Sequence, residues 1–324
     1  MKVIQYDEYG SPDVLRLKQI DKPLPKENEV LIRIHAVSVN SWDWDLLTGR
    51  PYIYRLFFGL FKPRYPVIGS DIAGIVEATG TKVTKFKPGD AVFGDVSAAG
   101  WGGFAEYATA PENTLIHKPA NMTFEQAAAL PQAGTLALQG VKDYGKVQSG
   151  QHVLINGAGG GMGTFAIQIA KFYGAIVTAV DSVEKFEIMR SVGADYVIDY
   201  KETDFTREDK KYDLILDASA WHSIFDYRRV LKKDGRYVIV GGSVLVILQI
   251  LFLGLPLSLF SSKKMQILAH KPNQDMHVLT ELFESGQLTP IIDKCYHLED
   301  TAKALAHIGA GKAKGKIVVK TDAL

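Results

Sequence analysis

The chain has 324 residues, of which 47% are hydrophobic and 23% charged, and its formal net charge at pH 7 is +1. This length accommodates two domains with a large core, and a net charge so close to zero gives no field that favours nucleic acid or an anionic membrane. The single cysteine, Cys295, excludes an intrachain disulfide framework, and the N-terminus carries no apolar signal segment, so we expect a cytoplasmic protein.

The first 120 residues have the pattern of a β-rich domain. Short apolar runs alternate with turn segments such as Lys-Pro-Gly-Asp at 87–90. The pattern changes at Thr123, which we predict to cap a helix and to form a capping box with Gln126. From there on, helical and strand patterns alternate.

Residues 153–182 carry the most informative motif. An apolar run ends in a glycine cluster, an amphipathic helix pattern follows, and a second apolar run ends at Asp181. This order predicts a strand, a tight turn, a helix and a parallel strand, in which the free N–H groups at the helix start bind a pyrophosphate. The residues that we expect to hold the dinucleotide here are Gly157, Gly160, Gly161, Met162 and Gly163.

The rest of the chain predicts βαβ units around a parallel sheet. The expected strands lie near 153–156, 176–180, 196–198, 213–217, 236–240 and 265–269. Helices are expected at 274–286 and 299–309, and a closing strand at 315–320. The predicted fold is α/β, a Rossmann-type doubly wound sheet over residues 121–270, inserted into a β-rich domain that is built from residues 1–120 and 271–324.

The segment 244–260 is unusually apolar and nearly long enough to span a bilayer, but Gln249, Gly254, Pro256 and Ser258 interrupt it. We expect a buried loop and helix at the cofactor pocket or at a subunit interface. Peripheral membrane contact, helped by Lys263 and Lys264, is the less favoured alternative.

Several ordered segments are similar to the medium-chain dehydrogenase/reductase superfamily, over nearly the whole chain. The matching segments are SVNSWDWDLLTG at 38–49, YPVIGSDIAGIVEATG at 65–80, KFKPGDAVFG at 85–94, GGFAEYATAP at 102–111, LINGAGGGMG at 154–163, SVGADYVIDY at 191–200 and GKIVVK at 315–320. The chain most resembles the zinc-free quinone oxidoreductase branch, which includes zeta-crystallin and the reticulon-interacting oxidoreductase. The resemblance implies that the β-rich domain is GroES-like and that the protein is a homodimer.

The zinc ligands of related alcohol dehydrogenases are missing. In those enzymes a cysteine lies in the segment that corresponds to 38–45 and a histidine lies at the position of Ser70. A four-cysteine structural lobe is also absent. Catalytic zinc needs three protein ligands and structural zinc needs four, so we expect no metal site.

The coenzyme can be argued in two ways. Asp181 ends the second strand of the motif, where a carboxylate binds the adenosine ribose of NAD. In the quinone reductase branch, however, residues at the positions of Ser182, Lys185 and Tyr200 resemble groups that hold a 2′-phosphate, although Glu184 opposes this. We favour NADP(H) over NAD(H).

The resemblance also supplies candidate residues near the reacting groups. Thr135 resembles the residue that approaches the nicotinamide, and Gly241 and Gly242 follow a strand where close backbone approach is expected. Asn40 is the leading candidate for contact with the substrate carbonyl or the nicotinamide ribose, and Tyr52 is the second. The aromatic residues that we expect to shape an apolar pocket are Trp42, Trp44, Phe57 and Phe58.

Together, these features predict a zinc-independent NAD(P)H-dependent oxidoreductase that reduces quinones or α,β-unsaturated carbonyls by hydride transfer. Two alternatives stay open at this point. One is a zinc-free NAD-linked alcohol or aldehyde dehydrogenase. The other is a non-enzymatic nucleotide-binding redox sensor.

Overall fold

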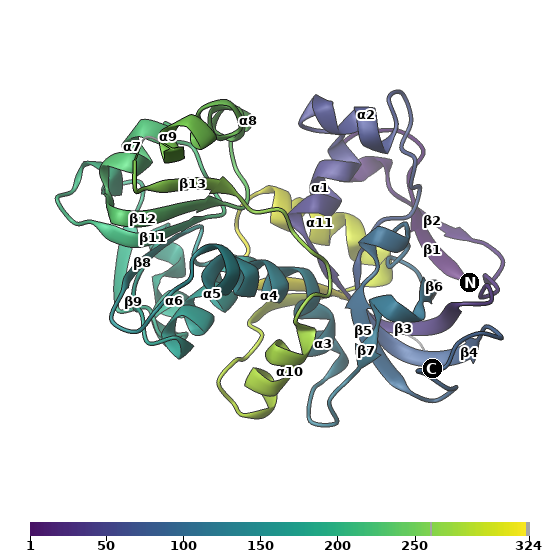
Figure 1. Cartoon of the computed structure of the whole chain (residues 1–324). Coiled ribbons are helices and arrows are strands. Elements are labelled where there is room, and N and C mark those ends of the chain that lie inside the picture. Colours follow the sequence, from purple (N-terminus) through teal and green to yellow (C-terminus); the bar gives the residue numbers. More distant parts are fainter. Residues whose placement is uncertain (260, 322–324) are drawn as a thin grey trace. The chain divides into compact units, whose positions relative to one another are not determined.

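The protein consists of two compact units in a computed structural model that describes residues 1–259 and 261–321, without the side chain of Leu255. Unit 1 comprises Met1–Gln132, Pro272–Glu284 and Pro290–Leu324. Unit 2 comprises Ala133–Lys271 and Ser285–Thr289. Figure 1 gives the labels of the helices and strands.

Unit 1 is built on a seven-stranded sheet that joins both ends of the chain. Its strands are β3 (Glu29–Val39), β4 (Asp71–Thr79), β5 (Ala91–Asp95), β6 (Tyr107–Pro111), β7 (Ile116–His117), β14 (Ile292–His297) and β15 (Lys316–Lys320), and a separate hairpin pairs β1 (Lys2–Gln5) with β2 (Arg16–Gln19). The long strand β3 pairs with β15 through Ala36–Val39 and with β6 through Glu29–Arg33, both antiparallel. The closing strand predicted at 315–320 therefore completes the sheet of the N-terminal region.

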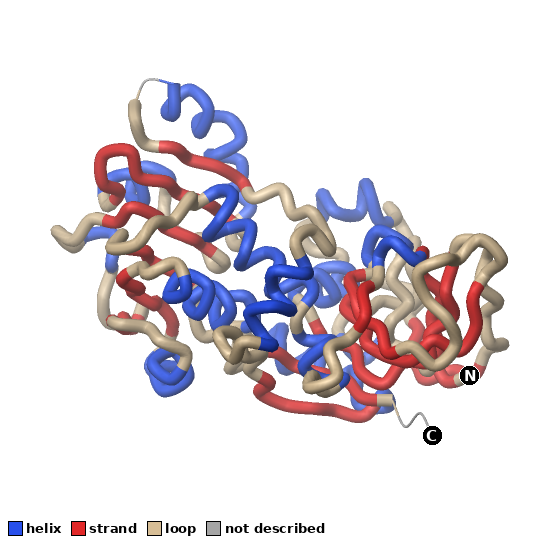
Figure 2. Tube along the Cα trace, turned by 60° about the horizontal axis from the view of Figure 1, so that its bottom comes forward, coloured by secondary structure: helices blue, strands red, loops and turns tan. Residues whose placement is uncertain are grey.

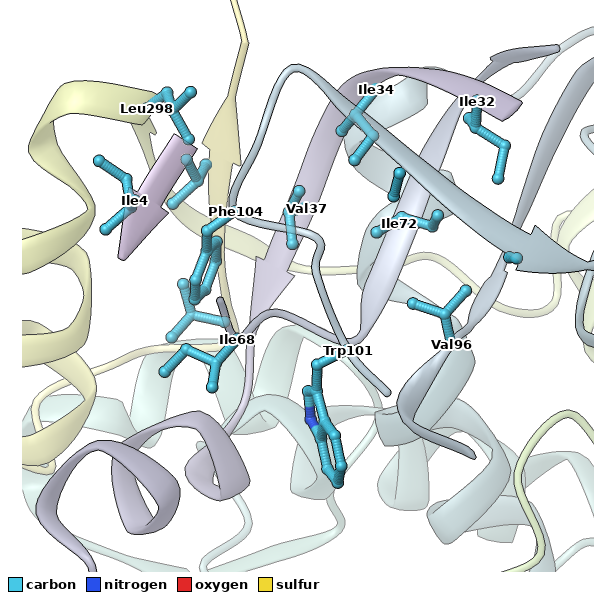
Figure 3. Close-up of a cluster of buried hydrophobic side chains, with 14 of the residues drawn as sticks. Ile4, Ile32, Ile34, Val37, Ile68, Ile72, Val96, Trp101, Phe104 and Leu298 are labelled. Atoms are coloured by element: carbon cyan, nitrogen blue, oxygen red, sulfur yellow. The ribbon is translucent and has the colours of Figure 1, made fainter. Parts of the chain in front are cut away.

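Alternating apolar side chains from these strands form the core of unit 1. Ile32, Ile34 and Val37 of β3 and Ile72 of β4 are fully buried and belong with Phe104 to one hydrophobic cluster, part of which is drawn in Figure 3. The helices of this unit are α1 (Ser41–Thr48), α2 (Arg55–Phe58), α3 (Phe124–Ala129), α10 (Met276–Glu284) and α11 (Thr301–Gly309), with short 3₁₀ turns η1 (Pro12–Val14), η2 (Tyr52–Tyr54), η3 (Ser97–Ala99), η4 (Glu112–Thr114) and η9 (Leu298–Asp300).

The capping box predicted at Thr123 is confirmed. The hydroxyl of Thr123 accepts a hydrogen bond from the backbone N–H of Gln126, and the side chain of Gln126 accepts one from the N–H of Thr123. The box belongs to α3, which contacts β3, β4 and β15 of unit 1.

The boundaries of the two units differ from those predicted from the sequence. Residues 121–132, predicted to belong to the nucleotide-binding domain, cluster with unit 1, and Ser285–Thr289 clusters with unit 2.

Unit 2 is a six-stranded parallel sheet in the order β10-β9-β8-β11-β12-β13. Its strands are β8 (His152–Asn156), β9 (Ile176–Asp181), β10 (Tyr196–Asp199), β11 (Tyr212–Asp217), β12 (Leu231–Ile239) and β13 (Lys264–Ile267). The spatial order corresponds to 3-2-1-4-5-6, so the topological switch point lies between β8 and β11, where dinucleotides bind in such folds. Figure 2 shows the strands of this sheet side by side, with helices following most of them.

The segments between these parallel strands contain the helices α5 (Gly161–Phe172), α6 (Phe186–Ser191), α7 (Ile224–Arg229), α8 (Val244–Gln249) and α9 (Leu255–Leu259), the π-helical turn η8 (Ile250–Gly254) and the 3₁₀ turns η6 (Val183–Lys185) and η7 (Phe205–Arg207). Helix α4 (Pro131–Leu138), which begins at the end of unit 1, and the π-helical turn η5 (Gln139–Tyr144) precede β8. In α5 one face is apolar and buried, as its amphipathic pattern predicted.

The apolar segment 244–259 is helical and lies beside β13 at one edge of the sheet (Figure 1). Val246 and Ile250 are buried, but Leu251 and Phe252 are 60% and 69% exposed. Only one side of the segment packs on the sheet, so the predicted burial of its outer face would need a second surface, such as the predicted subunit interface. Residue 260 lies outside the described residues, and no helix among those described is both long and apolar enough to cross a membrane.

Candidate functional site

The glycine segment forms a tight turn between β8 and α5. Gly157 adopts a φ of 78°, a left-handed conformation that glycine reaches without steric cost. The N–H groups of Gly157 and Ala158 both donate to the carbonyl of Val180 at the end of β9, which fixes the turn at the strand ends. Helix geometry leaves the N–H groups of Gly161, Met162 and Gly163 without intrahelical acceptors. They lie at the positive end of a 12-residue helix, which is suited to an anion.

The glycines of this loop differ in what surrounds them. A methyl group at Gly160 would meet only the carbonyl oxygen of Gly157, at 3.5 Å, so its Cα borders open space. A methyl group at Gly163 would instead approach the Cα of Ala158 to 2.5 Å and collide with two backbone oxygens. Gly163 is therefore needed for close packing of helix on strand, whereas Gly160 leaves room for a ligand. This open cradle fits a pyrophosphate.

Asp181 ends β9 directly beside this loop. Its Oδ2 accepts a hydrogen bond of 3.0 Å from the N–H of Gly159, and its Oδ1 accepts one of 2.8 Å from the N–H of Ser182. The ammonium of Lys185 lies 3.2 Å from Oδ1, and both side chains are about nine-tenths buried. The structure thus brings together Asp181, Ser182 and Lys185, and the aspartate and the lysine neutralise each other.

A second pair of charges lies beside the first. The side chain of Ser182 and the ammonium of Lys201 form hydrogen bonds with the carboxylate of Glu184. These contacts lower the pKa of Glu184 to about 2. The Lys201 Nζ to Glu184 Oε1 distance is 3.3 Å, and both side chains are about half exposed. Tyr200 is 42% exposed, and its N–H donates to the carbonyl of Asp181. Sequence reasoning missed Lys201, although its position next to Tyr200 could have indicated it.

The other coenzyme candidates also lie in unit 2. Thr135 is fully buried in α4, and its Oγ1 lies 2.8 Å from Nε2 of His270. Gly241 and Gly242 follow β12, where the carbonyl of Gly241 accepts a hydrogen bond from Ala220 in the loop after β11. A methyl group at Gly242 would collide with Ala220, so the two loops are in direct backbone contact.

A buried carboxylate holds the strand ends at the switch point together. Oδ1 of Asp217 accepts hydrogen bonds from Nδ2 of Asn156 at 2.8 Å and from the N–H of Ser219 at 3.0 Å, and its Oδ2 accepts one from the hydroxyl of Tyr237 at 2.9 Å. Burial raises the pKa of Asp217 to about 6, although these hydrogen bonds and one from Tyr227 act to lower it. No sequence signal had pointed to this network, because its members come from three strands.

Unit 1 contains a buried polar cluster around Asn40. The amide Nδ2 of Asn40 donates to Oδ2 of Asp71 at 3.0 Å and to Oγ of Ser70 at 3.3 Å, and its Oδ1 accepts from the ammonium of Lys316. Lys316 also lies 3.8 Å from Asp71, and these two side chains are 3% and 0% exposed. Burial raises the pKa of Asp71 and lowers that of Lys316. All hydrogen-bonding groups of the Asn40 amide are thus engaged within unit 1.

Asp43 extends this cluster through the backbone. Its carboxylate accepts hydrogen bonds from the N–H of Asn40 at 2.8 Å and from the N–H of Gly69 at 3.0 Å. The first bond caps α1, and the second fixes the chain just before Ser70. The carboxylate is fully buried, which raises the pKa of Asp43 to about 7.

The aromatic residues near Asn40 fall into two groups. The rings of Trp42 and Phe58 contact each other at a centroid distance of 5.8 Å. Trp44 lies against Gly309 of α11, away from this group, and Phe57 is 68% exposed. Tyr52 is 64% exposed in η2, and its ring faces the guanidinium of Arg55 at 4.9 Å.

The residues around Asn40 do not fit a zinc ion. Among the described residues, no group of three or more His, Cys, Asp or Glu side chains is placed to hold a metal. Asn40 and Ser70 supply an amide and a hydroxyl rather than the thiolate and imidazole that zinc prefers. The ammonium of Lys316 already provides the buried positive charge beside Asp71.

Known proteins match the whole chain. Residues 26–120 match the alcohol dehydrogenase GroES-like domain, and residues 192–319 match a family described as zinc-binding dehydrogenase. A chloroplastic quinone oxidoreductase of Triphysaria versicolor is 33% identical over 333 residues, which cover 99% of this chain and 98% of that protein. The chain belongs to the quinone-oxidoreductase-like branch of the medium-chain dehydrogenase/reductase superfamily.

Two further matches extend this result. The NADPH-dependent alkenal/one oxidoreductase of Arabidopsis thaliana is 32% identical over 330 residues, covering 98% of this chain and 79% of that protein. The structure of the quinone oxidoreductase from Coxiella burnetii superposes with a TM-score of 0.87 at 29% identity, covering 99% of both chains. The predicted superfamily and fold, a Rossmann sheet with a GroES-like domain, are therefore confirmed, and the chain is an oxidoreductase of an NAD(P)H-dependent family.

Proposed function

We propose that this member of the superfamily reduces quinones or α,β-unsaturated carbonyls with NADPH and without zinc. The open cradle at Gly160, beside the start of α5, carries the coenzyme part of the proposal. The relatives named above, which act on quinones and on alkenals or alkenones, support the substrate class. The amide and hydroxyl of Asn40 and Ser70 support the absence of a catalytic metal.

In this proposal the N–H groups of Gly161, Met162 and Gly163 hold the pyrophosphate. Ser182, Lys185 and Tyr200 bind the 2′-phosphate, with Lys201 as an additional cation. Gly157, Thr135, Gly241 and Gly242 border the coenzyme through backbone and hydroxyl contacts. Bound NADPH supplies a hydride; the residues of this chain bind and orient the reactants.

Hydride transfer to the substrate places negative charge on its carbonyl oxygen, and a hydrogen-bond donor is needed to stabilise this charge. The exposed phenol of Tyr52 is one candidate donor. Asn40 acts in this proposal as a positioning residue, because its amide is engaged by Asp71, Ser70 and Lys316. No side chain of a nucleophilic triad is required.

We further propose a cytoplasmic homodimer, and the exposed thiol of Cys295 suits a reducing compartment.

The test is a steady-state panel of NADPH and NADH against 9,10-phenanthrenequinone, trans-3-penten-2-one and a simple aldehyde, with and without a chelator. We expect turnover of the quinone or the enone with NADPH, unchanged by the chelator. Preferred turnover of aldehydes, or chelator-sensitive activity with stoichiometric bound zinc, would overturn the proposal. Tight coenzyme binding without turnover of any acceptor would point to a sensor.

A further inference from the structure

The backbone of Trp101 adopts an unfavourable conformation that the turn around it does not require. Its φ is 61°, between Gly100 at 108° and Gly102 at 106°. A bulky residue in this left-handed region is a steric outlier that typically costs about 1–3 kcal/mol. Glycine at position 101 would adopt this conformation without strain. The tryptophan side chain therefore destabilises the turn relative to glycine.

The indole of Trp101 carries a second cost. The residue is 8% exposed, and its Nε1 is buried without a hydrogen-bond partner among the described residues. A buried donor that lacks an acceptor costs about 1–3 kcal/mol. Figure 3 shows the indole extending away from the other labelled side chains of the core cluster. Packing within that cluster would be served by a side chain without a polar atom.

Aromatic rings surround this indole. Trp42 lies nearly parallel to it, with an interplanar angle of 18° and centroids 6.4 Å apart. Phe58 meets it edge-on at 5.7 Å, and Tyr65 packs at 4.8 Å. Trp42 is 41% exposed, so its ring can turn aside on the fast timescale of exposed side chains.

The loop that carries Trp101 is tied to the polar cluster around Asn40. The N–H of Trp101 donates to the carbonyl of Val96, and the N–H of Val96 donates to the carbonyl of Ser70 at 2.8 Å. Trp42 lies two residues after Asn40, at the start of α1. Backbone hydrogen bonds therefore connect the aromatic rings to the polar cluster within unit 1.

We propose that Trp101 and Trp42 form the subsite for a flat aromatic carbonyl substrate, in which Nε1 of Trp101 donates a hydrogen bond to a carbonyl oxygen. This inference rests on the proposed function and narrows its substrate to quinones. The ring of the substrate stacks on the indole of Trp42, and its carbonyl oxygen meets the edge of Trp101, where Nε1–H points outward in the plane of the indole. The reaction, quinone + NADPH + H⁺ giving hydroquinone + NADP⁺, leaves the indole unchanged, and the N–H stabilises charge that develops on the oxygen.

Two substitutions separate the donor from the aromatic surface. Trp101→Phe keeps a ring but removes the N–H, and Trp42→Leu removes an exposed stacking face. We expect Trp101→Phe to raise KM for 9,10-phenanthrenequinone about three- to tenfold, the worth of one hydrogen bond, with the affinity for NADPH unchanged. Trp42→Leu should raise KM for this quinone by at least threefold and KM for the linear trans-3-penten-2-one by less than twofold.

The control is Trp44→Phe, since Trp44 has no ring contact with another aromatic side chain among the described residues. An effect of Trp101→Phe no larger than that of Trp44→Phe would overturn the inference while leaving the reductase proposal intact. If Trp101→Phe does not fold, the quinone-against-enone ratio of Trp42→Leu decides, and an unchanged ratio overturns the subsite.

Binding can be followed without turnover. In protein saturated with NADP⁺, with Trp44→Phe and Trp221→Phe as background, Trp42 and Trp101 are the remaining tryptophans, and 9,10-phenanthrenequinone should quench their fluorescence. Trp101→Phe should raise the Kd from this titration by the same three- to tenfold. If the wild-type protein turns over no quinone or enone, the reductase proposal fails, but the titration still decides the subsite. Absence of quenching, or an unchanged Kd, overturns it.

Discussion

The ammonium of Lys316 donates a hydrogen bond to Oδ1 of Asn40, a residue 276 positions earlier in the chain. This bond sets the orientation of the amide, so that Nδ2 points at Asp71 and Ser70. A cation supplied by the closing strand thus organises the region that follows β3.

Replacing Lys316 by Met should destabilise unit 1 strongly. The carboxylate of Asp71 would remain buried without its cation, and breaking one partner of a buried pair typically costs about 3–5 kcal/mol. Urea unfolding at pH 8, followed by tryptophan fluorescence in a Trp221→Phe background, measures this, because the other three tryptophans lie in unit 1. Lys320→Met, on the same strand but in a partly exposed pair with Glu125, should cost less than about 1 kcal/mol. Equal losses would contradict this account.

The stability of unit 1 should fall as the pH rises from about 4 to 7. Burial raises the pKa of Asp43 to about 7 in the folded protein, against about 3.9 in an unfolded chain. Between these values the folded state binds the extra proton, so the unfolding free energy decreases with pH and levels off above about 7. Asp43→Asn should flatten this slope, although it also loses one of two backbone hydrogen bonds. Asp7→Asn, at a side chain 76% exposed, is the control and should leave the slope unchanged.

Sequence patterns predicted the parts of this molecule that depend on neighbours in the chain. The glycine turn, the capping box at Thr123 and the alternation of strands and helices are local, and their periodicity indicates them directly. The β-rich domain built from both chain ends was predicted from local strand patterns, and the resemblance to a family supported it. In contrast, the apolar density of 244–259 did not reveal which side of the segment meets the sheet.

The polar networks could not be predicted in the same way. Asn40 was chosen by position, but its partner Lys316 comes from the opposite end of the chain. Thr135 and His270 are likewise 135 positions apart. Such long-range pairs can be predicted only when the three-dimensional arrangement of the strands and helices is known. The positive φ of Trp101 is equally invisible, because its flanking glycines indicate a turn but not which residue bears the strain.

Two glycines of the nucleotide loop should respond oppositely to substitution. Gly160→Val should leave the thermal midpoint nearly unchanged, because the backbone there is extended and its Cα borders open space, yet it should abolish coenzyme binding measured by NADPH fluorescence. Gly163→Ala should lower stability by about 1–3 kcal/mol through overpacking against Ala158. Unchanged coenzyme affinity in a folded Gly160→Val protein would remove this loop from the site.

The coenzyme preference should depend on Lys185. If its ammonium leaves Asp181 to bind a 2′-phosphate, Lys185→Ala should weaken NADPH binding about ten- to a hundredfold, and NADH binding much less. Lys171→Ala is the matched control, because that lysine lies in the last turn of α5 and pairs with Asp195. Small and equal effects on both coenzymes would favour the interpretation in which Asp181 binds the ribose of NAD.

The last prediction concerns the exposed face of 244–259. Leu251 and Phe252 are 60% and 69% exposed beside β13, one of the two outer strands of the parallel sheet. An apolar face next to an unpaired strand edge favours burial against a second copy related by a two-fold axis. We expect light scattering to report a dimer, and the double substitution Leu251→Glu and Phe252→Glu to produce a monomer. Leu24→Glu, at a side chain 86% exposed in unit 1, should leave the dimer intact. A wild-type monomer that floats with anionic liposomes would instead assign this face to a membrane surface.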